Sequence, residues 1–164
     1  MDLEYIQDRV DEQIKRYGGY WNPLSMMLRL IEEVGELSRA INIKYRQKKA
    51  KGQTDGREVE YELVDVLYTI IAIANSCNLK LKDKLILNPK KELKNNDNLS
   101  VLVNLTIIIG DTYQKTIDNL SIEENIYKML EEVKDIISYL DVDIKKYFEE
   151  KLELDEWKVN EIYN

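Results

Sequence analysis

Two short segments of the chain carry acidic side chains at a spacing that could bind a metal ion. They read IEEVGEL and YELVDVLY, and their acidic residues are Glu32, Glu33, Glu36, Glu62 and Asp65. On a helix, residues three or four apart share a face, where like charges repel by a few tenths of a kcal/mol per pair. A crowded acidic face therefore needs a reason, and a bound cation that neutralises the charge is one.

Both segments lie beside apolar stripes with helical periodicity. At about 100° per residue, the first stripe consists of Leu30, Val34, Leu37 and Ile41, and the second of Val59, Val66, Ile70 and Ile73. Glu33 and Glu36 border the first stripe, and Glu62 and Asp65 border the second. If the two helices pack antiparallel, with Gly35 permitting close approach, four carboxylates converge at one half-buried position. The alternative is a pair of solvated acidic helix faces.

The composition restricts the chemistry that such a site could perform. The chain has no histidine and one cysteine, Cys77. This excludes Ser-His-Asp and Cys-His catalysis, Cys/His zinc sites and an internal disulfide framework. A metal would have to be held by oxygen ligands, which favours a hard cation such as Mg²⁺, with Mn²⁺ as the alternative.

Length and charge indicate the general class of protein. The 164 residues are enough for one compact domain, and the net charge of −7 argues against nucleic acid as a partner. The longest apolar run, VLVNLTIII, is too short to cross a bilayer. The opening MDLEYIQDRVDEQ is charged and does not resemble a secretory signal. We therefore expect a cytoplasmic protein with no membrane contact.

Helical periodicity and only two prolines predict an all-α fold, a helical bundle. Asn22-Pro23 is a start signal for the second helix, and SIEE at 121–124 has the pattern of a capping box for the fifth. The β-branched residues of 99–117 leave a strand open there. Polar connectors are expected at 48–56 and 85–98, and helices at about 3–17, 22–46, 55–77, 99–117, 121–140 and 144–157.

The motifs EEVGE (32–36) and ELVD (62–65) resemble the Glu-Glu-x-x-Glu and Glu-x-x-Asp signature of the all-α nucleoside triphosphate pyrophosphohydrolases. That superfamily includes MazG-like enzymes, dimeric dUTPases and dCTPases. Residues 18–51 are similar to the single-domain MazG-like branch, and the resemblance covers roughly residues 1–80. It implies Mg²⁺-dependent cleavage of a (deoxy)nucleoside triphosphate to the monophosphate and pyrophosphate.

The resemblance also implies roles for individual residues. Glu33, Glu36, Glu62 and Asp65 would be metal ligands, and Glu32 would orient the attacking water or support the ligands from outside. Glu32 and Glu33 are thus the candidate catalytic residues. Substrate contacts are predicted, on weaker grounds, for Trp21, Lys44, Arg46, Thr69 and Lys151. The alternatives are a solvated basic loop for the cations near 44–49 and a core anchor for Trp21.

The second half of the chain could be a degenerate copy of the first. A shift of 75 residues pairs Gly35-Glu36 with Gly110-Asp111, and a shift of 63 pairs Glu62 with Asn125. Residues 99–160 would then have lost the metal site, and the chain would be a fused pseudo-dimer that can itself form a homodimer. Two other functions remain open: a nucleotide-binding regulator without efficient turnover, and a phosphoribosyl-ATP pyrophosphohydrolase.

Overall fold

The computed structural model describes residues 2–44, 58–82 and 98–162, with side chains as far as Glu153. All regular elements in these residues are helices, which confirms the all-α prediction. They are α1 (Leu3–Arg16), α2 (Pro23–Lys44), α3 (Glu58–Ser76), α4 (Asn98–Ile117), α5 (Glu123–Leu140) and α6 (Ile144–Ile162). None of the helices in the described ranges has the length and apolar character needed to cross a membrane.

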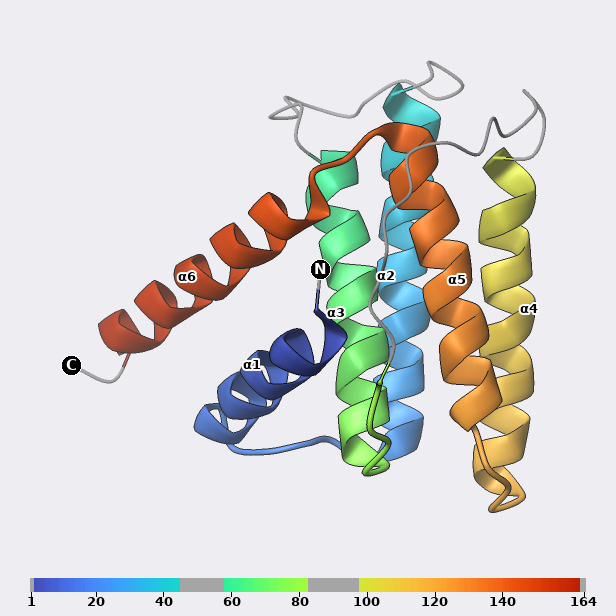
Figure 1. Ribbon diagram of the computed structural model, residues 1–164, viewed down its shortest axis with the longest axis horizontal. Coiled ribbons are helices and arrows are strands. Elements are labelled where there is room, and N and C mark those ends of the chain that lie inside the picture. Colours follow the sequence, from blue (N-terminus) through green and yellow to red (C-terminus); the bar gives the residue numbers. More distant parts are fainter. Residues whose placement is uncertain (1, 45–57, 83–97, 163–164) are drawn as a thin grey trace.

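Helices α2 to α5 form an antiparallel bundle (Figure 1). Helix α2 packs against α3 and α4, and α5 packs against the same two helices from the other side. Helices α1 and α6 both pack on α3 and extend away from the bundle. This arrangement places α3 at the centre of the molecule, with four other helices around it.

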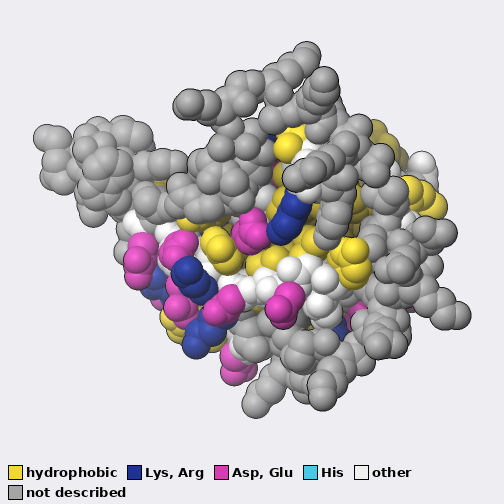
Figure 2. Space-filling model, turned by 90° about the horizontal axis from the view of Figure 1, so that it is seen from above, with side chains coloured by type: hydrophobic (Ala, Val, Ile, Leu, Met, Phe, Trp, Pro, Cys, Tyr) yellow, Lys and Arg dark blue, Asp and Glu magenta, His cyan; other side chains and the backbone are white. Residues whose placement is uncertain are grey.

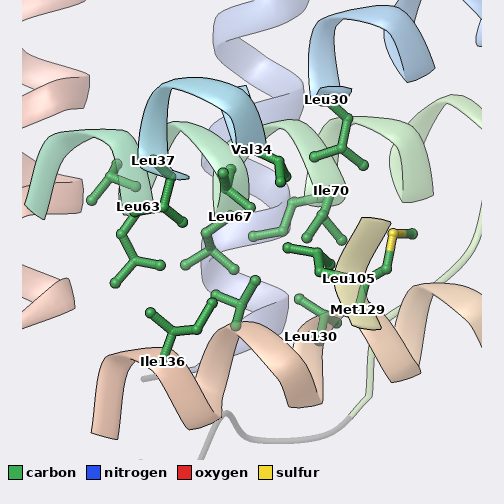
Figure 3. Packing of buried hydrophobic residues seen from close by; sticks show 14 of the residues in the cluster. Leu30, Val34, Leu37, Leu63, Leu67, Ile70, Leu105, Met129, Leu130 and Ile136 are labelled. Carbon is green, nitrogen blue, oxygen red and sulfur yellow. The ribbon is translucent and has the colours of Figure 1, made fainter. Parts of the chain in front are cut away.

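The bundle core is built from the apolar stripes of all four helices (Figure 3). Its fully buried members include Leu30, Leu37, Leu63, Leu67, Ile70, Leu105, Ile126 and Met129. Burying a side chain of this size contributes about 1.5–3 kcal/mol. The four predicted stripe residues of α3 are all buried, but so are Leu63, Val64 and Leu67 between them. Helix α3 is therefore covered on nearly every face, as its central position requires.

The predicted elements agree with the described helices, apart from the strand alternative for 99–117 and the end of the last helix. Residues 99–117 are a helix, so the strand alternative is wrong: Leu102, Leu105 and Ile109 are buried at helical spacing. Tertiary burial of that face outweighs the small helix penalty of β-branched side chains. Helix α6 continues past the predicted end at Trp157 to Ile162.

The capping prediction is right for α2 and wrong for α5. The side chain of Asn22 accepts a hydrogen bond from the Ser25 amide at 3.0 Å, as expected for an N-cap before Pro23. At α5 the N-cap is Ile122, which has no side-chain cap. The Ser121 hydroxyl accepts only a long 3.4 Å bond from the Glu123 amide, because the helix begins one residue later than the motif suggested.

Gly35 does not mark a close approach between helices of this chain. A Cβ atom built at Gly35 would meet nothing within 4 Å, and the same holds for Gly110 on α4. The prediction that Gly35 lets α2 approach its neighbour is therefore wrong for the contacts described here. Both glycines are exposed on the outer side of the bundle.

Candidate metal centre

Three of the four predicted metal ligands come together between α2 and α3. Glu33 on α2 and Glu62 and Asp65 on α3 each offer a carboxylate oxygen, and these three oxygens lie within 4.8 Å of one another. Oxygens bound to one Mg²⁺ lie at most about 4.2 Å apart. A small inward movement of the side chains would therefore bring this carboxylate triad around a single cation.

Burial and mutual repulsion change the protonation of the triad. Burial raises the pKa of Glu33 to about 7, and the negative charge of Asp65 adds to the effect. Burial also raises the pKa of Glu62 to about 7, followed by repulsion from Glu36 and Asp65. Both groups therefore hold a proton more strongly than a solvated glutamate, because ionising them adds charge to a crowded, partly dehydrated position.

One oxygen of the triad has no hydrogen-bond partner. The Glu33 side chain is only 2% exposed. Its Oε1 pairs with the guanidinium of Arg29, whereas its Oε2 is buried and accepts no hydrogen bond from the described residues. A buried carboxylate oxygen without a partner is unfavourable, since it has lost its water and gained nothing in return. The residues present therefore fit a hard divalent cation.

Basic side chains surround the triad. Arg29 contacts Glu33 and Glu32, the latter at 2.7 Å. Arg39 Nη2 lies 3.9 Å from Glu62 Oε1. In the view of Figure 2, acidic and basic side chains gather in one region of the surface beside apolar ones. These cations offset part of the charge that a metal would otherwise neutralise.

Lys151 on α6 reaches the triad from a distant part of the sequence. Its ammonium pairs with the carboxylate of Asp65 and lies 5.5 Å from the centre of the Tyr68 ring. The neighbouring Glu150 accepts a 2.9 Å hydrogen bond from the Tyr61 hydroxyl, which also holds α6 against α3. The structure thus places Lys151 at the edge of the triad, where the sequence had suggested a phosphate contact.

Glu36 and Glu32 lie outside the triad. Glu36 is half-buried, and its charge helps to raise the pKa of both Glu33 and Glu62, so it lies close to them. Glu32 is exposed and turned toward solvent, with Arg29 as its ion-pair partner. The catalytic and ligand roles of these two residues stay predictions.

Of the other predicted substrate contacts, Trp21 and Lys44 lie away from the triad, whereas Thr69 lies one helical turn from Asp65. Trp21 precedes the start of α2, and Lys44 is its last residue, about 17 Å along the helix from Glu33 at 1.5 Å per residue. Trp21 is 64% exposed, and Lys44 pairs with Glu60 at 3.1 Å. The buried Thr69 hydroxyl donates to the Asp65 carbonyl at 2.8 Å. Arg46, with Lys48 and Lys49, lies outside the described residues.

Sequence reasoning missed the role of Arg39 and did not predict the partner of Lys151. The i, i+4 spacing of Arg29 and Glu33 on one helix is visible in the sequence. In contrast, Arg39 and Lys151 contact carboxylates on a different helix. Such contacts depend on how the helices pack, and the helical period of a single segment carries no signal for them.

The α4/α5 pair contains a polar network of its own. Lys115 Nζ donates to Asn125 Oδ1 at 2.8 Å and lies 3.1 Å from Asp111 Oδ2. The Asn125 amide donates to Asp111 at 2.8 Å and to the Thr112 hydroxyl at 3.0 Å. Asn125 is only 1% exposed. An ammonium group of the chain itself therefore supplies the positive charge at this contact.

Comparison with known proteins identifies the α2/α3 segment. Residues 21–87 match the MazG nucleotide pyrophosphohydrolase domain. The uncharacterized protein YpjD of Bacillus subtilis (strain 168) is 42% identical over 82 residues, which are 49% of this chain and 74% of YpjD. The chain belongs to the MazG nucleotide pyrophosphohydrolase family. This family membership rests on sequence, since no solved structure matches. The MazG match includes the whole triad, whereas α4 to α6 lie outside it.

We expect Glu62→Gln to raise the melting temperature of the metal-free chain at about pH 8 and to change it little at about pH 4.5. The folded-state pKa of Glu62 is raised from 4.5 to about 7. The folded state favours the neutral form of Glu62, so this group contributes fully to the free energy of unfolding below about pH 4.5. The contribution is lost as the pH rises through about 7, where Glu62 must ionise in the folded chain as well. Glutamine stays neutral throughout. Calorimetry in EDTA at both pH values measures the difference.

The exposed Glu131, which pairs only loosely with Lys134 at 3.3 Å, provides the control. Glu131→Gln should show the same small effect at both pH values. Adding Mg²⁺ at about pH 8 should stabilise the wild type more than Glu62→Gln, because a cation replaces the proton on the triad. A Glu62→Gln variant that melts lower than the wild type at about pH 8 in EDTA would contradict the electrostatic account of the triad.

We expect Lys115→Met to lower the free energy of unfolding by about 1–3 kcal/mol, because it leaves the buried Asn125 carbonyl without its donor. The loss should be the same in EDTA and in Mg²⁺. Lys128→Met is the matched control, since the 2.6 Å pair of Lys128 with Glu124 is exposed and should contribute little. Urea unfolding measures both variants, and equal losses would refute a special role for Lys115.

Proposed function

We propose that this protein hydrolyses (deoxy)nucleoside triphosphates to the monophosphate and pyrophosphate with the help of Mg²⁺. The observation that carries the proposal is the carboxylate triad with its unpartnered, buried Glu33 Oε2. The triad lies within the segment that matches the MazG domain. Carboxylate ligands together with substrate phosphates form the coordination that Mg²⁺ prefers in nucleotide enzymes.

In this proposal Glu33, Glu62 and Asp65 hold the cation, and the nearby Glu36 completes the set. Bound Mg²⁺ would supply positive charge to the phosphate oxygens and fix their orientation. The chain itself holds the carboxylates in place through the antiparallel packing of α2 and α3. Such positioning provides most of the catalysis in phosphoryl-group hydrolysis, and no histidine or covalent nucleophile is needed.

Proton transfer and phosphate binding are assigned to neighbouring side chains. Glu33 is assigned to proton transfer as well as to metal binding. Burial raises its pKa to about 7 in the metal-free chain, and a bound cation would lower this pKa again because it favours the ionised carboxylate. Glu32, one residue earlier, is assigned to orienting water from outside the triad. Lys151 at the triad's edge is assigned to a phosphate oxygen, because its ammonium already lies against Asp65.

We also propose that the chain is a fused pseudo-dimer. Helices α2 and α3 form one antiparallel pair and α4 and α5 form another, and the two pairs pack together through α2 with α4 and α3 with α5. The Asp111, Lys115 and Asn125 network would occupy the place of the ancestral metal site in the second pair. One working metal site per chain follows from this proposal.

The proposed substrate is consistent with a cytoplasmic location, where nucleoside triphosphates are abundant, and we propose that compartment. The net charge of −7 also makes nucleic acid an unfavourable partner. The base and the sugar of the substrate are recognised by side chains other than the triad. Their recognition depends on hydrogen bonds within a pocket, because in this proposal the triad would hold only the phosphate end of a nucleotide through the cation.

We expect monophosphate and pyrophosphate when the protein is incubated with a panel of (d)NTPs and Mg²⁺. Glu33→Gln should lower kcat/KM about 100-fold or more, since even residues that only support a metal ligand affect activity by 10–100-fold. Ion-exchange chromatography separates the products. Glu131→Gln, an exposed acid on α5, is the control and should keep full activity. Diphosphate and inorganic phosphate as products would exclude the proposed cleavage position.

We expect Lys151→Met to lower kcat/KM about 10–100-fold while Lys151→Arg, which keeps the positive charge, retains much more activity. Lys145, on the same helix but exposed and 3.9 Å from Glu149, is the control: Lys145→Met should behave like the wild type. Steady-state kinetics with the best substrate of the panel measure these effects. Equal activity of Lys151→Met and the wild type would remove Lys151 from the substrate site.

A further inference from the structure

Each carboxylate of the triad has a basic side chain against one of its two oxygens. The three pairs are Arg29 with Glu33 Oε1, Arg39 with Glu62 Oε1 and Lys151 with Asp65 Oδ1. The contact of Arg39, at 3.9 Å, is longer than a hydrogen bond. Lys151 reaches its partner from a different helix. Arg29 differs from both because it lies on the same helix as the carboxylate that it contacts.

The guanidinium of Arg29 is held by two carboxylates at once. Its Nη1 donates a 2.7 Å hydrogen bond to Glu32 Oε2, while its Nη2 pairs with Glu33 Oε1. The two partners follow Arg29 at i+3 and i+4, positions at which side chains of one helix meet. Both contacts are therefore set by α2 alone. A planar guanidinium with two nitrogens engaged in this way has little freedom to leave Glu33 Oε1.

The two oxygens of Glu33 are consequently in different situations. Oε1 carries the guanidinium, whereas Oε2 is buried and has no hydrogen-bond partner among the described residues. A cation that enters the triad meets Oε2 as the free oxygen. To bind Oε1 as well, the cation would have to approach the positive charge of Arg29, which repels it. Glu33 therefore offers one oxygen to a metal far more readily than two.

The number of oxygens that a carboxylate offers affects which cation it favours. Ca²⁺ takes roughly 6–8 oxygens and often binds both oxygens of one carboxylate, whereas Mg²⁺ takes about six, several of them from water or phosphate. The spacing of the triad does not discriminate between them. Its oxygens lie within 4.8 Å of one another, and opposite oxygens around Ca²⁺ are about 4.6–5.2 Å apart. Selection between the two cations must come from the number of ligand atoms.

We propose that Arg29 makes the triad selective for Mg²⁺ over Ca²⁺ by restricting Glu33 to one coordinating oxygen, Oε2. This role rests on the proposed function, since it concerns the cation that would hold the nucleotide phosphates. One oxygen per carboxylate leaves positions in an octahedral shell for water and phosphate, whereas Ca²⁺ loses a ligand that it would otherwise use. Arg29 acts through Glu33 and is thus a positioning residue of the metal centre.

Titration calorimetry with Mg²⁺ and with Ca²⁺, at about pH 8 where the ligands are ionised and without nucleotide, tests this role. The quantity compared is the ratio of the two dissociation constants. Arg29→Met should shift this ratio about 10-fold toward Ca²⁺, because residues that support a metal ligand change affinity by 10–100-fold. Arg29→Lys keeps a positive charge beside Oε1 and should stay close to the wild-type ratio. Circular dichroism verifies that both variants keep the helical fold.

Arg39→Met is the matched control. It removes the same charge from the edge of the triad, but Arg39 lies beyond hydrogen-bond distance of Glu62, at 3.9 Å. Loss of that charge should strengthen the binding of both cations to a similar extent and leave their ratio unchanged. The control therefore separates general electrostatic attraction from occupation of a single oxygen.

An unchanged ratio in Arg29→Met would overturn the role of Arg29, even in a chain that binds Mg²⁺ and hydrolyses (d)NTPs. An equal shift in Arg39→Met would overturn it too, because charge alone would then explain the effect. A wild type that binds neither cation would overturn both the metal centre and the role of Arg29. Conversely, a shifted ratio in a chain that does not cleave (d)NTPs would support the role of Arg29 and exclude the proposed reaction.

Discussion

The repulsion among the carboxylates between α2 and α3 is the constraint on which the site depends. Glu33, Glu62 and Asp65 would separate in water, yet the apolar stripes beside them hold the two helices together. Burial of those stripes supplies several kcal/mol, which is enough to keep the charges close. The electrostatic cost of this proximity is visible in the raised pKa values of Glu33 and Glu62 and in the buried Glu33 Oε2, which has no hydrogen-bond partner among the described residues. This is the condition under which a cation binds most strongly.

The same packing makes α3 the helix on which both the core and the triad depend most. It carries two of the three triad residues, and α1, α2, α5 and α6 all pack against it. Its carboxylates therefore cannot move away from α2 without disturbing the core. The polar residues that fix α1 on it, such as Asn75 bonded to the Gln7 carbonyl at 2.9 Å, further restrict its position. A metal site needs this rigidity because its ligands bind well only within a narrow range of positions around the cation.

The two helix pairs balance charge in different ways. In α2/α3 five carboxylates lie near three basic residues, so the positive charge compensates only in part. The carboxylates are those of Glu32, Glu33, Glu36, Glu62 and Asp65, and the basic residues are Arg29, Arg39 and Lys151. In α4/α5 a single ammonium, that of Lys115, lies between an amide and a carboxylate and satisfies both. The α2/α3 contact therefore favours binding of an external cation, whereas the α4/α5 contact already contains the ammonium group of Lys115. MazG family membership is consistent with this difference, since the matched region ends before α4.

Sequence alone determined the helices, the paired carboxylates and the family resemblance. These features depend on relations within one helix, where the 3.6-residue period fixes which side chains share a face. Only the tertiary structure decided that Lys151 meets Asp65, that Arg39 approaches Glu62 and that Gly35 faces outward. Those relations depend on the packing of different helices against one another, which residue spacing does not encode. For the same reason the exposure of apolar residues such as Leu28, Ile31 and Ile107 could not be foreseen. Apolar residues at helical spacing look like core residues until the packing of the bundle shows which side of each helix remains exposed.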